Sequence, residues 1–210
     1  MKNQSLTNQV FSEGAELYAK KFMNFDAYHY SFDKFLDLIN VSNPSIVDAA
    51  CGPGNISKYL LSKNQHLEIN GIDLAPKMIE LAKQLNPSAD FELRGLLDFD
   101  QNYDAIICGF GLPYLNKEEA IQFINKSAEH LNKDGVLYIS TMEGNYEKSS
   151  FQAPSSGKGP SLFIHYHEAS YLKKNMIING FEILFEDRKE YVHTKEKTFT
   201  DLILIARKIN

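Results

Sequence analysis

The residues of this chain whose types and spacing best suit chemistry are two glycines and an aspartate. Gly52 and Gly54 closely follow the mostly apolar run 46–50, and Asp73 stands 21 residues beyond Gly52. Glycines at the end of a buried strand let bare backbone approach a ligand closely. An acidic residue about 20 residues further along a β-α-β unit accepts hydrogen bonds from ribose hydroxyls. The spacing therefore predicts a site for a nucleoside cofactor.

A third glycine, typical of the dinucleotide-binding form of this turn, is replaced by Ser57. That glycine allows the helix to pack closely beneath a pyrophosphate. The serine therefore disfavours a pyrophosphate ligand, and a nicotinamide-dependent oxidoreductase stays as the alternative enzyme class.

The same segment resembles motif I of the class I S-adenosylmethionine (SAM) dependent methyltransferases, usually a strand ending in Asp-x-Gly-x-Gly-x-Gly. Residues 48–54 read Asp-Ala-Ala-Cys-Gly-Pro-Gly, with Ala50 in place of the first glycine. Residues 71–78, Gly-Ile-Asp-Leu-Ala-Pro-Lys-Met, are similar to the family's Asp-x-Ser-x-x-Met stretch. The resemblance implies SAM as cofactor and S-adenosylhomocysteine (SAH) as product.

The resemblance also implies where the cofactor would lie. The two glycines would face its aminocarboxypropyl part, Asp73 would take both ribose hydroxyls, and an N-terminal helix would cover the site. The cofactor-binding residues expected on this basis are Tyr18, Ala50, Gly52, Gly54, Asp73, Leu74, Met78, Leu96, Asp98 and Phe110. For Tyr18, Leu74, Met78 and Phe110 the alternative is ordinary core packing.

The adenine contact departs from the family pattern. After the third strand the family often has Gly-Asp-x-x-x-Leu, whereas residues 94–98 here read Arg-Gly-Leu-Leu-Asp, with Gly95 at the aspartate position. Adenine would then be read by backbone groups near Leu96 or by Asp98. The alternative for Asp98 is a solvated loop acid.

The sequence contains no strong signature of a catalytic base. Methyl transfer from a sulfonium needs alignment above all, and it needs a base only where the nucleophile carries a proton. The candidates are His165, Tyr166 and Tyr114, and the first two follow a Gly/Ser/Pro-rich stretch, residues 149–161, that has the composition of a lid. The alternative makes His165 a surface imidazole and His167 the start of a helix.

Alternating strand and helix patterns must position these groups. Apolar spacing predicts N-terminal helices in residues 10–25 and 30–39 and later helices at 56–62, 76–85 and 117–131. The predicted strands are 45–49, 67–73, 91–94, 103–108, 136–142, 181–185 and 198–206, the last two joined by a polar hairpin at 191–197. This order predicts an α/β, Rossmann-like fold, with a seven-stranded, mostly parallel sheet that ends in an antiparallel hairpin. Helices would lie on both faces.

Three further segments resemble later motifs of the family. Residues 102–108 are similar to its fourth strand with a leading Asp, and Gly180-Phe181 matches its Ala-Gly-Phe turn. Residues 131–140 are similar to its Leu-Lys-Pro-Gly-Gly-x-Leu turn, with Asp134 replacing the first glycine. The resemblance thus covers most of the chain.

Composition sets the class of protein and partner. The 210 residues, 43% hydrophobic and 23% charged, suit one domain, residues 1–210, with a helical cap at 1–42 and a substrate lid at 143–165. A formal charge of −5 with scattered basic residues disfavours nucleic acid. Residues 1–9 lack an apolar signal core, and no apolar run approaches the roughly 20 residues of a membrane span. We therefore expect a cytoplasmic protein.

Cys51 and Cys108 are too few for a disulfide framework or a zinc site, and no metal site is expected. The sequence thus predicts an enzyme, a SAM-dependent methyltransferase with a small-molecule acceptor. The alternatives are the oxidoreductase and a SAM-binding protein without catalysis. The acceptor, its reacting atom and the choice between monomer and homodimer stay open.

Overall fold

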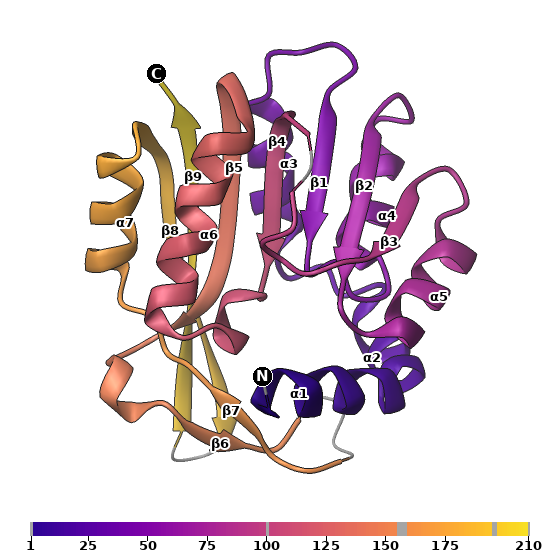
Figure 1. Cartoon of the computed structure of the whole chain (residues 1–210), viewed down its shortest axis with the longest axis vertical. Coiled ribbons are helices and arrows are strands. Elements are labelled where there is room, and N and C mark those ends of the chain that lie inside the picture. Colours follow the sequence, from indigo (N-terminus) through magenta and orange to yellow (C-terminus); the bar gives the residue numbers. More distant parts are fainter. Residues whose placement is uncertain (1, 100, 155–158, 195–196, 210) are drawn as a thin grey trace.

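The computed structural model describes residues 2–99, 101–154, 159–194 and 197–209. Its central element is one seven-stranded sheet with the strand order β3-β2-β1-β4-β5-β9-β8 (Figure 1). The strands are β1 (Ser45–Ala49), β2 (Glu68–Asp73), β3 (Asp90–Leu93), β4 (Tyr103–Gly109), β5 (Leu131–Glu143), β8 (Phe181–Thr194) and β9 (Lys197–Lys208). The first five are parallel, and β9 pairs antiparallel with both β5 and β8. The predicted fold class is confirmed.

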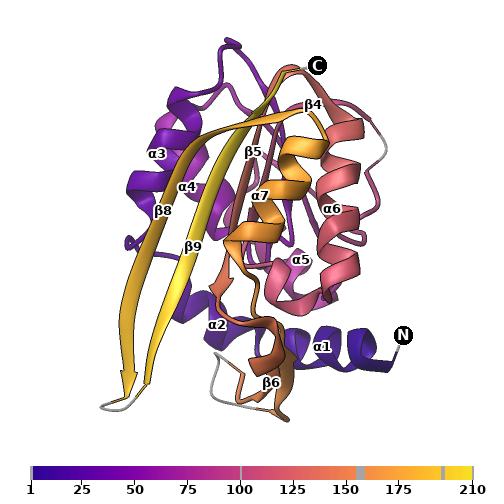
Figure 2. The same cartoon turned by 90° about the vertical axis from the view of Figure 1, so that its left-hand side faces the viewer.

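Two hydrophobic clusters lie on the two faces of the sheet, because residues of one strand alternate between its faces. One cluster joins Ile46, Ile107 and Ile203 to α3 (His29–Asp37) and α4 (Asn55–Lys63). The other joins residues such as Val47 and Leu202 to α6 (Lys117–His130) and α7 (Ala169–Ile178). Figure 2 shows the two pairs of helices on opposite sides of the sheet. The helix α5 (Pro76–Leu85) packs against β2 and β3.

The strand order reverses between β1 and β4, since β1 pairs with β2 on one side and with β4 on the other. Crossovers from β1 run in one direction along the sheet and crossovers from β4 in the other. The loops at the carboxyl ends of these two strands therefore diverge and leave room for a ligand. This reversal lies where the glycine turn after β1 is found.

In the N-terminal cap, two helices stand where one was predicted in residues 10–25. Residues 10–25 fall in α1 (Lys2–Glu13) and α2 (Ala15–Phe22), which are separated at Gly14. A glycine costs helix stability, and here it permits the change of direction. Figure 1 shows α1 and α2 beyond the carboxyl ends of the parallel strands. The cap therefore covers the edge of the sheet at which the topology reverses.

The C-terminal half differs most from the predicted elements. Most of the predicted polar hairpin, residues 191–197, is strand, because β8 and β9 extend well beyond the other strands of the sheet. Residues 195–196 lie outside the described residues. The predicted lid contains the 3-10 helix η2 (Tyr146–Lys148) and two short antiparallel strands, β6 (Ser150–Gln152) and β7 (Leu162–Ile164). Its residues 155–158 also lie outside the described part. The helix α7 begins at Ala169, two residues after His167, which is close to the helix start that the alternative interpretation of His167 gave.

Within the described ranges, no helix combines the length and the apolar character needed to cross a membrane.

Candidate functional site

The turn after β1 is held open by three residues in the left-handed conformation. The φ angles are 59° at Ala50, 54° at Gly52 and 79° at Gly54. The backbone N–H of Gly52 donates to Oδ2 of Asp73 at 2.9 Å, and the N–H of Ala75 donates to Oδ1 at 2.8 Å. The carboxylate at the end of β2 thereby fixes the turn after β1.

The two glycines of the turn have different surroundings. A Cβ added to Gly54 would lie 2.4 Å from Nδ2 of Asn86 and 3.3 Å from the ring of Phe91. A Cβ added to Gly52 would have the ring of Tyr18 as its nearest neighbour, at 3.9 Å. Gly54 is therefore required by the packing of α4 on its neighbours. Gly52 borders open space beneath Tyr18.

Asp48 is fully buried behind the turn. Its Oδ2 accepts a hydrogen bond of 2.6 Å from the hydroxyl of Ser57, and its Oδ1 has no hydrogen-bond partner among the described residues. Burial, aided by the charge of Asp73, raises the pKa of Asp48 to about 6 in spite of the bonds from Ser57. Ser57, at the position of the missing third glycine, therefore serves to anchor this carboxyl group.

The carboxyl of Asp73 is half-buried, and burial raises its pKa although backbone N–H groups that point at it act in the opposite sense. The Cys51 thiol between the two aspartates has a pKa well above its usual value, first because it is buried and then because both carboxylates repel a thiolate. Cys51 and Cys108 are both free and buried. Neither thiol is activated as a nucleophile.

The N-terminal cap lays tyrosine and phenylalanine rings over this turn. Burial, and then the charges of Asp73 and Asp48, raise the pKa of Tyr18 to about 12. Consecutive ring centroids lie 4.5–6.0 Å apart in the series Tyr114, Phe11, Tyr18, Phe22, Phe25, Tyr28, Phe110. We call this series the aromatic wall. It begins at Tyr114, passes the glycine turn at Tyr18 and ends at Phe110, the residue that follows β4.

The loop after β3 brings one predicted residue close to the turn and leaves another away from it. A Cβ on Gly111 would lie 2.8 Å from Leu96 and 3.0 Å from Ala50, so the loops after β1, β3 and β4 converge. The side chain of Asp98 is exposed, and its Oδ2 accepts the backbone N–H of Gly95 at 2.9 Å. Leu96 therefore lies at the meeting point, and Asp98 closes its own loop.

The other predicted contacts also lie near the turn. Met78 is buried in a small cluster with Ala15 and Ala75, against which Tyr18 packs, and Leu74 is half-buried after β2. Phe110 has a φ of 58°, and its N–H donates to the backbone oxygen of Ser140 at 3.0 Å. Its ring meets Tyr28 at 5.2 Å. The ten predicted cofactor residues thus lie in the strand ends, loops and helices at the carboxyl edge of β1, β2, β3 and β4, with Asp98 turned into its own loop.

The three candidate bases do not share one location. Tyr114, in the 3-10 helix η1 (Leu112–Tyr114), lies in the aromatic wall, 5.0 Å from the ring of Phe11. Leu162 and Ile164 of β7 pack toward α1, while His165 stacks on Tyr146 at 5.6 Å. Strand alternation therefore places the His165 ring on the face of β7 opposite α1. Tyr166 is buried next to Phe199 of β9, and its hydroxyl accepts a hydrogen bond from Gln152.

His167 has a structural environment. Its Nε2–H donates to the backbone oxygen of Leu112 at 2.8 Å, so in the neutral ring Nδ1 is left as the acceptor for the hydroxyl of Tyr171. Burial lowers the pKa of His167 to about 4. The neutral ring therefore ties η1 to the start of α7. Burial also lowers the pKa of His165.

Tyr28 and Asp201 were not predicted as site residues. The hydroxyl of Tyr28, in the segment before α3, donates to Oδ2 of Asp201 on β9 at 2.5 Å. The Asp201 side chain is 1% exposed, and its Oδ1 has no hydrogen-bond partner in the described part of the chain. The one sequence signal was a carboxylate directly before the apolar run 202–206 of a buried strand.

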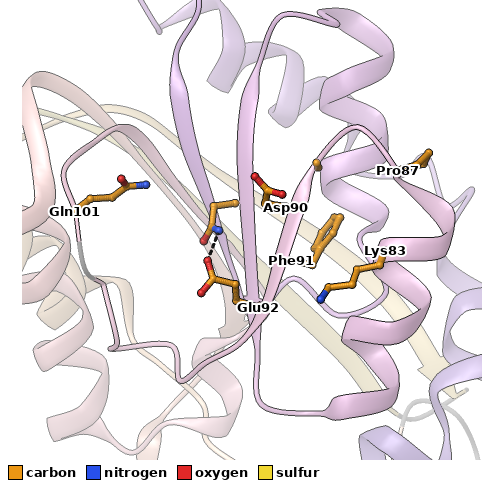
Figure 3. Close-up of a pocket in the computed structure, with 8 residues that line it drawn as sticks. Lys83, Pro87, Asp90, Phe91, Glu92 and Gln101 are labelled. Atoms are coloured by element: carbon orange, nitrogen blue, oxygen red, sulfur yellow. Dashed lines mark hydrogen bonds between the residues drawn. The ribbon is translucent and has the colours of Figure 1, made fainter.

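A separate surface hollow of about 660 Å³ lies along the edge strand β3. In Figure 3 the ring of Phe91 lies on the side of the strand toward Lys83 of α5 and toward Pro87, which follows that helix, whereas Glu92 lies on the other side and accepts a hydrogen bond from Asn70. The hollow lies beside this edge strand. None of the residues that line it belongs to the predicted site.

The glycine turn fits the group that the sequence implied. Each oxygen of Asp73 takes one backbone N–H and keeps a second lone pair, as two adjacent hydroxyls of a ribose would require. The open space over Gly52 admits a ligand that a Cβ would displace. Leu74 and Leu96 are half-buried apolar side chains on neighbouring loops, and Met78 is buried beneath Tyr18.

Comparison with known proteins agrees with this geometry. Residues 46–135 match the family model described as a methyltransferase domain. The malonyl-[acyl-carrier protein] O-methyltransferase of Acetivibrio thermocellus is 31% identical over 135 residues, which are 59% of this chain and 47% of that protein. The demethylmenaquinone methyltransferase of Thermotoga maritima is 30% identical over 110 residues, which are 50% of this chain and 47% of that protein. The chain spans about half the length of the curated relatives it matches.

Among solved structures, the magnesium protoporphyrin IX methyltransferase of Synechocystis PCC 6803 with bound SAM superposes with a TM-score of 0.73. It is 20% identical and the match covers 99% of this chain and 98% of that one, which shows the shared fold. The motif matches, the strand order and the family model agree: residues 46–135 are similar to the methyltransferase-domain family, and the chain shares the fold of the SAM-bound structure.

Proposed function

We propose that this protein transfers the methyl group of SAM to a small-molecule acceptor. The observation that carries the proposal is the bond between the Gly52 backbone and Asp73, which joins a left-handed glycine turn to a strand-end carboxylate beneath Tyr18. This arrangement suits a ligand that combines a ribose with an amino-acid tail. The relatives named above are methyltransferases, which supports the same activity here.

In this proposal the chain's own residues divide the cofactor among them. Asp73 accepts the ribose hydroxyls, and Gly52, Ala50 and Tyr18 surround the amino-acid part. Leu74, Met78 and Leu96 line the adenine, with Asp98 near the edge of its loop. Gly54 supports the turn from behind, and Phe110 borders the region of transfer. Bound SAM would supply an electrophilic methyl group on a sulfonium.

Positioning is the main contribution we assign to the protein in this reaction. The rings of the aromatic wall would exclude water and align the acceptor with the methyl group. Tyr114 is the candidate base that stands in this wall, while His165 and Tyr166 remain candidates on the neighbouring hairpin.

The acceptor is a small molecule in this proposal. Figure 1 shows α1, α2, β6 and β7 together beyond the carboxyl ends of the parallel strands, and such a cover suits a small ligand rather than nucleic acid. We also propose a cytoplasmic location, because two buried free thiols suit a reducing compartment.

Two measurements test the proposal. Calorimetric titration should show binding of SAM and SAH and no binding of NAD, which separates a methyltransferase from an oxidoreductase. Transfer of a labelled methyl group to members of a metabolite panel then separates an enzyme from a SAM-binding protein without catalysis. Binding of NAD in place of SAM would overturn the proposal.

A further inference from the structure

The proposed function assigns no role to the buried carboxyl group of Asp201, which lies near the site. Asp201 lies opposite Met142 in the register of β9 and β5, two residues beyond the pair Ile203 and Ser140. Ser140 is level with Gly109, the last residue of β4. Asp201 therefore stands just past the carboxyl edge of the parallel strands, with β5 between it and the end of β4.

The side chains around Asp201 are mainly apolar and aromatic. Directly paired residues of an antiparallel ladder share one face, so Asp201 and Met142 point the same way. Met142 packs against the cluster formed by Val10 of α1 with Leu162 and Ile164, and Tyr114 packs against the same cluster. Tyr28, bonded to Asp201, contacts Phe110 and Phe25 of the aromatic wall. The carboxyl group of Asp201 thus lies among side chains that are otherwise apolar or aromatic.

One oxygen of this carboxyl has no bond that compensates its burial. Oδ2 is held by Tyr28, whereas Oδ1 is buried without a hydrogen-bond partner among the described residues. Lys189 is the cross-strand neighbour of Asp201, but its ammonium group donates to the backbone oxygen of Ala27 at 2.7 Å. A buried acceptor without a donor is costly unless a ligand supplies one.

We infer that Asp201 binds the methyl acceptor, by accepting a hydrogen bond from an O–H or N–H group on a flat, apolar molecule held by the aromatic wall. The inference rests on the proposed function. Phe25 is 46% exposed, so the aromatic wall reaches the surface at this residue. In this arrangement Asp73 binds the cofactor, and Asp201 contacts the acceptor but not the cofactor.

The test uses two probes that differ in one donor group, p-cresol and 4-methylanisole, titrated by ligand-observed NMR into the SAH-saturated protein. A hydrogen bond to a charged group predicts that p-cresol binds about tenfold more tightly than the ether. Asp201→Asn should remove this preference, while its calorimetric SAH affinity stays within about twofold of the wild type. Equal preference in the wild type and in Asp201→Asn would overturn the inference.

The chain provides a matched control. Asp187 of β8 accepts a hydrogen bond of 2.6 Å from the hydroxyl of Tyr30, the same pairing of carboxylate and tyrosine at an exposed position. Asp187→Asn should keep the preference for p-cresol in full. Loss of the preference in Asp187→Asn as well would also contradict the inference.

A second variant distinguishes recognition from support of the cap. Tyr28→Phe keeps the carboxylate and removes its covering hydroxyl, so p-cresol affinity should be kept or raised. If Asp201 only anchors the cap, both variants weaken SAH binding in parallel and leave the probe preference unchanged, and the inference fails. If the wild type binds no SAH at all, the proposed function fails first, which is a distinct result.

Discussion

The backbone N–H of Gly52 donates a hydrogen bond of 2.9 Å to the carboxylate of Asp73, which stands 21 residues later in the chain. The bond joins the turn after β1 to the end of β2, and the same carboxylate also accepts the N–H of Ala75. The residue proposed to hold the ribose therefore also shapes the glycine turn. Loss of this side chain should affect binding through both roles.

We expect Asp73→Ala to weaken SAH binding by about 2 to 4 kcal/mol, or roughly thirty-fold to a thousand-fold, because two charge-assisted bonds disappear. Calorimetric titration measures the effect, and thermal unfolding confirms that the variant is folded. Asp90→Ala, which removes an exposed carboxylate from β3, is the control. Unchanged SAH affinity in folded Asp73→Ala would remove the basis of the proposed cofactor site.

The two turn glycines should respond differently to alanine. Gly54→Ala places a Cβ 2.4 Å from buried Asn86 at a φ of 79°, so we expect a loss of about 2 kcal/mol or more in unfolding free energy. Gly52→Ala has room for its Cβ, and its main effect should be a lower SAH affinity. Denaturant unfolding and SAH titration of both variants separate the two roles. A stable Gly54→Ala protein that no longer binds SAH would reverse this assignment.

Ala50 carries backbone strain at the position where the family usually has glycine. Its φ of 59° costs an L-residue about 1 to 2 kcal/mol, and a glycine would remove this cost. Part of the gain is offset because glycine raises the conformational entropy of the unfolded state. We therefore expect Ala50→Gly to stabilise the protein by about 0.5 to 1 kcal/mol in denaturant unfolding. Ala49→Gly, in the buried strand beside it, should destabilise the protein. A lower stability of Ala50→Gly would show that the alanine side chain contributes packing that outweighs the strain.

The sheet could be predicted because its signals are local. Apolar strands, glycine turns and helix spacing lie within single segments, and the departures from the family motif kept their geometry. Ala50 and Asp134 both replace motif glycines, and both adopt a positive φ. The backbone path could thus be predicted from the sequence, whereas the strain at Ala50 and Asp134 could not.

Long-range pairing limited the rest of the prediction. The strand β8 continues to Thr194 because it pairs along its length with β9, and charged residues at 186–190 gave no local strand signal. The bond between Tyr28 and Asp201 joins residues 173 positions apart. No spacing rule connects such residues, so the acceptor side of the site could not be identified before the fold was known.

The position of His165 changes what we expect of this residue. Its ring stacks on Tyr146, and its neighbour Ile164 is the residue that packs toward α1. We expect His165→Ala to lower the melting temperature while methyl transfer to any acceptor found in the panel stays within about threefold. Tyr114→Phe, which alters the aromatic wall, is the comparison. A loss of turnover in His165→Ala with unchanged SAH affinity would instead make His165 the base.

Two buried aspartates should make the stability of the protein depend on pH. Burial raises the pKa of Asp48 and of Asp201 to about 6, against 3.8 for an unperturbed carboxyl. Tyr28, Lys189 and Tyr138 face Asp201, and the first two counteract the shift. Between the two pKa values the folded state binds more protons than the unfolded state. The contribution of each group is therefore complete below about pH 4 and is lost as the pH rises through 6.

Asparagine at either position cannot titrate, so comparison with the wild type isolates each contribution. We expect the stability of Asp48→Asn relative to the wild type to rise between pH 4.5 and 7.5, by at most about 2 to 3 kcal/mol, because each pKa unit corresponds to about 1.36 kcal/mol. Asp201→Asn should behave in the same direction. Denaturant unfolding at a series of pH values measures both, with exposed Asp90→Asn as the control. A difference that is constant with pH would mean that neither carboxyl group has a raised pKa in the folded protein.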